Sequence, residues 1–140
     1  MMTRRHFLTT LAASLAILTL NPAWAATPTL EIVAMQHPPV IAALKPLRAW
    51  IAQQGGKLRL VEIDAESPAG EKRFQSASLS GHIPILILID GQHVFKRRDG
   101  SQVALVKFPN VAGSPPGMRG DWVTADVVAL LDERIGAKRK

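Results

Sequence analysis

The chain has 140 residues, 47% of them hydrophobic, a formal net charge of +6 and no cysteine. This length and apolar content suit a single domain with one hydrophobic core. Because cysteine is absent, disulfide bonds and every reaction that needs a thiolate are excluded.

The first 25 residues predict a cleavable export signal. Arg4 and Arg5 precede a mainly apolar run, and the residues from Ala23 to Ala25 form a small-x-small cleavage site. The apolar run is short for a membrane span, which takes about 20 residues. The paired arginines, followed by Phe-Leu, resemble a twin-arginine signal; a Sec-type leader or an uncleaved anchor helix are the alternatives. We therefore expect a periplasmic or otherwise exported protein, with a mature domain at 26–140.

The mature chain opens with a predicted strand, helix and second strand. Thr29–Ala34 is the first strand, and Pro38 then opens a helix, because proline in the first turn sacrifices no helical hydrogen bond. Apolar residues recur at three- and four-residue spacing along this helix, which indicates one buried face. Pro46 lies inside the pattern and should kink the helix. Lys57–Asp64 alternates apolar and polar residues and is the second strand.

A wholly aliphatic strand and a tight turn dominate the middle of the chain. A short helix is expected at Glu71–Ser78, after a loop at Glu66–Gly70 that contains Pro68. Ile85–Ile89 lacks alternation, so both faces of this strand should be buried. Pro84 suits its first position, because proline donates no hydrogen bond to a sheet. Asp90-Gly91 predicts a type I′ turn, so Gln92–Lys96 is expected to pair back with this strand.

The last third contains a strand, a long loop and a terminal helix. Asp99-Gly100 marks a second turn before a strand at Val103–Phe108. A surface loop follows at Pro109–Gly120. Asp121 is the expected N-cap of the last helix, and a short basic tail from Ala137 ends the chain. The sequence shows no internal repeat and no second domain.

The order of these elements resembles the thioredoxin-like superfamily. The resemblance is specific at Gly81–Gly91, where Pro84 precedes a buried strand and a glycine turn, and Pro46 is similar to the family's helix-kinking proline. It implies an α/β fold, a thioredoxin-like three-layer sandwich with a central mixed sheet flanked by helices. It also implies a cis Ile83–Pro84 peptide bond, and a trans bond would contradict both site hypotheses drawn from the resemblance, the binding groove and the metal site.

The chain departs from the family at the turn between the first strand and the first helix. That turn carries Cys-x-x-Cys in the family, whereas here it runs from Met35 to Pro39 without a thiol. Thiol–disulfide oxidoreductase activity is therefore excluded. No other catalytic constellation is present in the sequence, so we assign no catalytic residues.

The resemblance places this turn beside the proline loop. His37 and Pro38 would then lie near His82, Ile83 and Pro84. We expect these residues to line a groove that holds an extended segment of another exported protein by strand-like pairing. This leading hypothesis requires no cofactor.

The alternative hypothesis is copper handling. Met35, His37 and His82 would supply one thioether and two imidazoles, which suit copper. The two hypotheses differ in the metal content of the purified mature protein.

Lys96, Arg97 and Arg98 form a basic cluster at the predicted hairpin tip. Such a cluster can meet an acidic partner or an anionic surface. Alternatively, these charges protect an edge strand from pairing with other chains. Nucleic acid is not an expected partner, because no platform of interleaved aromatic and basic residues is present.

Overall fold

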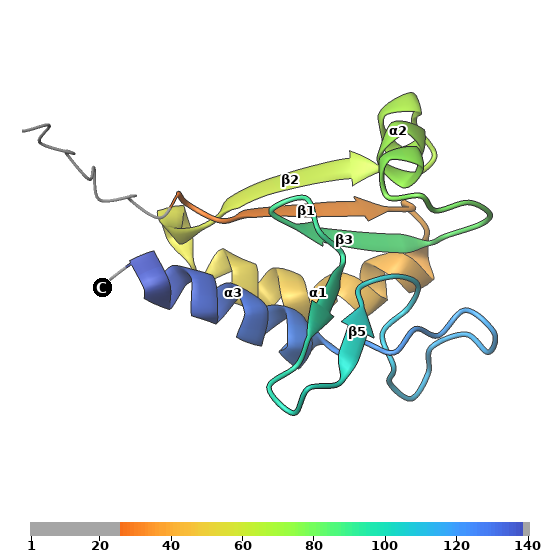
Figure 1. Ribbon diagram of the computed structural model, residues 1–140. Helices are drawn as coiled ribbons and strands as arrows, with labels where there is room; N and C mark the ends of the chain where they lie inside the picture. Colours follow the sequence, from red (N-terminus) through yellow and green to blue (C-terminus); the bar gives the residue numbers. More distant parts are fainter. Residues whose placement is uncertain (1–25, 139–140) are drawn as a thin grey trace, which may run out of the picture.

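The computed structural model describes residues 26–138, which form a mixed α/β structure (Figure 1). The described part contains three α-helices, a mixed three-stranded sheet and a two-stranded ribbon. No helix within these residues is both long and apolar enough to cross a membrane. Arg4, Arg5, Ala23 and Ala25, and with them the predicted export signal, lie outside the described residues.

The three-stranded sheet has the order β2-β1-β3. β1 (Thr29–Ala34) is its middle strand; β2 (Arg59–Asp64) runs parallel to it and β3 (Ile85–Ile89) antiparallel. The other edge of β3 pairs with the chain after β5, where Ile87 N donates to Leu105 O at 2.9 Å. All five residues of β3 are buried, which confirms the prediction from their unbroken aliphatic run.

Two long helices lie along the sheet, and one short helix lies at its end. α1 (Pro38–Ala52), which contains Pro46, and α3 (Thr124–Lys138) pack against each other along the sheet (Figure 1). A 3₁₀ turn, Gly55–Lys57, links α1 to β2. The short α2 (Pro68–Ser76) lies at the end of the sheet where β1 and β2 finish and β3 begins.

An ion pair fixes α2 to the sheet. Arg73 Nε of α2 lies 2.9 Å from Glu31 Oε2 on β1, and the Glu31 side chain is 12% exposed. Because β1 is the middle strand, this ion pair connects α2 to the central strand of the sheet as well as to the neighbouring edge strand β2.

The predicted turn after β3 is present, but the predicted hairpin is not. Asp90 and Gly91 both have positive φ, +50° and +81°, as a type I′ turn requires. Ile89 and Gln92 exchange two backbone bonds of 2.8 and 3.1 Å. β4 (Val94–Lys96) then pairs with β5 (Gln102–Ala104) and not with β3. The pairing expected for Gln92–Lys96 is therefore wrong beyond this single pair, because the turn at Asp99-Gly100 lets β4 pair with β5.

Two helix starts differ from the prediction. α2 begins at Pro68 and not at Glu71, because Ser67 Oγ accepts a bond from Gly70 N at 3.1 Å and caps the helix. α3 begins at Thr124, beyond the expected cap Asp121. The Asp126 carboxylate accepts the bond from Val123 N, at 2.9 Å, at this helix start.

The expected cis-proline is also absent. No peptide bond within residues 26–138 is cis, so the Ile83–Pro84 bond is trans and the prediction was wrong. The trans form is the lower-energy isomer for most X-Pro bonds. In this geometry the Pro84 carbonyl faces the first turn and accepts a hydrogen bond from Met35 N at 3.0 Å.

Candidate binding groove

The first turn and the proline loop lie side by side, as the sequence predicted. The bond from Met35 N to Pro84 O extends the β1–β3 pairing by one step beyond the strands. Met35 is buried, and it lines a groove of about 540 Å³ together with His82 and Ile83. Three of the predicted site residues therefore share one groove.

The other predicted residues lie around this groove and do not line it. Pro84 is buried in the chain that leads into β3, and Pro38 is exposed at the start of α1. His37 is exposed as well, but its Nε2 lies 3.1 Å from Oε2 of Glu66, and Glu66 does line the groove. His37 therefore reaches the groove only through this hydrogen bond.

The wall of the groove is α2, which the sequence prediction did not include in the site. Two residues after the end of α2, Ser78 adopts a left-handed conformation with φ +56°. Ser78 N donates to Gln75 O at 3.0 Å and Leu79 N donates to Phe74 O at 2.8 Å, the two bonds of a Schellman-type helix end. This end turns the chain away from the helix, so that the residues after Leu79 form the opposite side of the groove.

The floor of the groove is apolar and its rim is polar. Phe74 and Leu79 are half-buried and pack against the hydrophobic core. The apolar lining residues are Met35, Ala65, Pro68, Phe74, Leu79 and Ile83. Lone large apolar side chains in the otherwise polar stretch from Glu66 to Ser80 were the signal in the sequence that marks this floor.

The segment Ser80–Ile83 has an unpaired backbone. Within the described residues, no hydrogen bond involves any of its four residues. Ser80, Gly81 and His82 are exposed, and only Ile83 is buried. Backbone groups left unpaired beside a groove are free to bond with an added extended chain, as an exposed sheet edge does.

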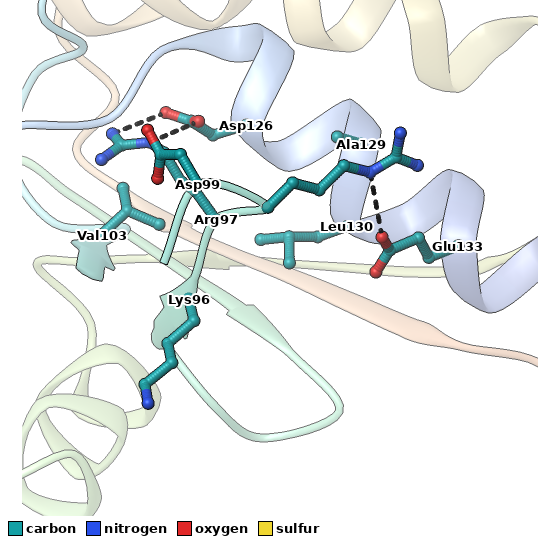
Figure 2. A pocket seen from close by; sticks show the side chains of 9 residues that line it. Lys96, Arg97, Asp99, Val103, Asp126, Ala129, Leu130 and Glu133 are labelled. Atoms are coloured by element: carbon teal, nitrogen blue, oxygen red, sulfur yellow. Dashed lines mark hydrogen bonds and ion pairs between the residues drawn. The ribbon is translucent and has the colours of Figure 1, made fainter. Parts of the chain in front are cut away.

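The predicted basic cluster lies elsewhere, beside a second groove of about 330 Å³ between the β4–β5 ribbon and α3 (Figure 2). Arg97 uses all five of its N–H groups. Nε and one terminal nitrogen donate to the two Asp126 oxygens at 2.8 and 3.1 Å. The remaining donors reach Asp121 O, Ser101 Oγ and Gln102 O. Arg97 therefore anchors the ribbon to α3.

The other two members of this cluster differ from Arg97. Arg98 is highly exposed and contacts Glu133 at 3.4 Å. The Lys96 side chain points away from Arg97 (Figure 2). The hydrogen bond from Arg97 holds the pKa of Asp126 below its ordinary value, and that carboxylate raises the pKa of Arg97. The cluster thus contains one internally bonded arginine and two cations at the surface.

The proposed copper ligands are only partly together. Met35 and His82 line the same groove, whereas His37 pairs with Glu66. Within residues 26–138, no group of three or more His, Asp or Glu side chains is placed to hold a metal ion. A copper site here would depend on the Met35 thioether and on His37 leaving its hydrogen bond with Glu66.

The groove is thus an open channel between α2 and Ser80–Ile83, with an apolar floor. Comparisons of the chain with protein-family models, with curated proteins and with solved structures find no match.

Proposed function

We propose that this protein is a non-redox binding module of an exported compartment. It holds an extended segment of a partner protein in the groove between α2 and Ser80–Ile83. The observation that supports this function is the unpaired backbone of Ser80–Ile83 beside an apolar floor. Main-chain hydrogen bonds would supply the affinity, and the floor would select alternate side chains of the partner.

We further propose that the fold is a thioredoxin-like three-layer sandwich. Parallel β1 and β2, antiparallel β3, and helices α1 and α3 packed together support it. The trans Ile83–Pro84 bond and the separate β4–β5 ribbon depart from the family pattern. The proposed groove therefore relies on the unpaired backbone and not on a cis-proline.

Peptides with methylated backbone nitrogens test the binding mode. Octapeptides that bind the full chain would be selected from a random display library, and each backbone N–H of one binder would then be methylated in turn. Strand-like pairing uses every second N–H, so methylation at alternate residues should weaken binding by about tenfold. His82→Ala should retain most of the affinity, because the proposed bonds are to the main chain. Equal tolerance of methylation at all positions would contradict this mode.

Copper handling is the second candidate, favoured by Met35 and His82 lining one groove. Titration with Cu(I) in the presence of a competing chelator measures this directly. A copper site should lose its affinity in Met35→Leu and in His82→Ala, whereas His93→Ala should bind like the unchanged protein. Equal affinity in all of these proteins would contradict a site at this groove.

A further inference from the structure

We infer that the segment bound in this groove is basic, with a Lys or Arg placed beside Glu66 and Glu71 and an apolar side chain seated on the floor. This inference rests on the proposed function. It adds the chemical class of the partner, which main-chain pairing by itself leaves open.

The charge on the groove is opposite to that of the whole chain. The protein has a formal net charge of +6, yet its groove is lined by two carboxylates and by no lysine or arginine. The remaining lining residue that can carry charge is the single imidazole of His82. A local acidic rim on a basic protein favours a cationic partner at this site over an anionic one.

Both carboxylates have bonding capacity to spare. Glu71 Oε1 accepts one hydrogen bond, at 3.3 Å, from the neutral amide of Gln75. Glu66 Oε2 contacts His37 Nε2, and both side chains are about half exposed, at 52% and 51%. An ammonium or guanidinium group bonds a carboxylate more strongly than a neutral amide does. A partner's cation can therefore bond Glu71, and it can bond Glu66 at the oxygen that His37 does not contact.

The apolar floor of the groove sets a second requirement for the bound segment, an apolar side chain. Phe74 and Leu79 are half-buried, so an apolar side chain laid over them removes further apolar surface from water. Successive side chains of a strand point to opposite faces. The apolar anchor and the basic residue should thus stand two positions apart, or another even number apart, so that both point into the groove.

Three matched octapeptides test the inference on the full chain. Each carries a Leu and, two residues later, Lys, Gln or Glu, in an otherwise identical Ser/Thr background with a fluorescent label. Fluorescence anisotropy should rank their affinities Lys above Gln above Glu, with about two- to fivefold per step, as exposed ion pairs give. The differences should shrink when the salt is raised from about 0.05 M to about 0.5 M.

Glutamate variants test whether the preference for the Lys peptide arises from the carboxylates of the groove. Glu66→Gln and Glu71→Gln should each reduce the preference for Lys over Gln, and the double change to Lys should reverse the order of the Lys and Glu peptides. Glu133→Gln, on α3 beside the other groove, removes the same charge and should change nothing.

The outcomes separate the two proposals. If all three peptides bind equally, or the Glu peptide binds best, the basic partner is wrong and the groove itself stands. If none of the three binds, and no peptide is selected from the random library, the proposed function fails and the inference fails with it.

Discussion

Gly70 allows α2 to start directly against the end of β2. A Cβ added at this position would collide with the carbonyl oxygen of Asp64 and lie 2.8 Å from both Cα and O of Ala65. These are backbone atoms, so the helix itself must shift. Gly70→Ala should lower the free energy of unfolding by roughly 1–3 kcal/mol, as overpacking does, when measured by urea denaturation.

Gly136 provides the matched control. It lies in α3, where an added Cβ would meet nothing within 4 Å. Gly136→Ala should therefore stabilise the protein by up to about 1 kcal/mol through helix propensity. A Gly70→Ala protein as stable as the unchanged chain would show that α2 can move without cost, and would remove the fixed wall from the proposed groove.

Asp126 makes stability depend on pH. The hydrogen bond from Arg97 is the largest cause that keeps its pKa below the ordinary 3.8, and the bond from Val123 N adds to it. A carboxyl group with a lowered pKa in the folded state binds fewer protons than in the unfolded state, so it stabilises the fold above its ordinary pKa. This contribution is lost as the pH falls through the lowered value. The free energy of unfolding should thus decrease with falling pH below about 4.

Asp126→Asn tests this assignment. Urea denaturation from about pH 6 to about pH 3 should show a shallower decrease for the variant, because the titrating group has been removed. Asp99 also has a lowered pKa, owing first to its hydrogen bond from Ser101, so some pH dependence should persist. Identical pH profiles for the two proteins would contradict the role given to Asp126.

At the scale of elements, β3 is the most buried strand of the sheet. Leu86 is 0% exposed within it. Leu86→Ala should lower the free energy of unfolding by roughly 2–5 kcal/mol, the usual cost of a cavity in a core. Leu60→Ala on the edge strand β2 makes the same chemical change at a side chain that is 39% exposed, and should cost much less. Similar losses for the two variants would contradict the burial described for β3.

The strands of the main sheet were predictable from the sequence because their patterns are local. The later strands were less so, because β5 ends at Ala104 where a strand was expected to reach Phe108, and the pairing of Gln92–Lys96 was not predicted. The aliphatic run specified Ile85–Ile89 with its correct bounds, and Asp90-Gly91 specified a turn with two positive φ angles. Two turn signals flank Gln92–Lys96, and each offers that segment a different neighbour. In the structure this segment pairs with β5, and the edge of β3 that it was expected to occupy pairs instead with the chain at Val106.

The candidate groove was predictable only in part. The resemblance placed Met35 near the proline loop, and the structure joins them by the bond to Pro84. The predicted cis isomer of the Ile83–Pro84 bond was wrong, because the residue types alone do not determine whether an X-Pro bond is cis or trans. The α2 wall was missed because Pro68 was interpreted as part of a loop, although Ser67-Pro68 is a helix-start signal.

At the scale of the whole molecule, the sheet brings the parts of the groove to one end. β1 and β2 finish there, β3 begins there, and α2 lies at the same end (Figure 1). The ion pair between Arg73 and Glu31 holds α2 on the middle strand. The groove is thus formed by a fixed helix on one side and by the unpaired Ser80–Ile83 segment on the other.

Amide hydrogen exchange followed by NMR tests the claim that this segment pairs with a partner's main chain. In the free protein the amides of Gly81, His82 and Ile83 should exchange rapidly, because they have no hydrogen-bond partner, whereas Met35 N–H should be protected by Pro84 O. Adding a saturating selected peptide should slow exchange at alternate residues of the segment and leave the amides of β4 and β5 unchanged. Protection confined to the β4–β5 ribbon, or no change in Ser80–Ile83, would contradict the account.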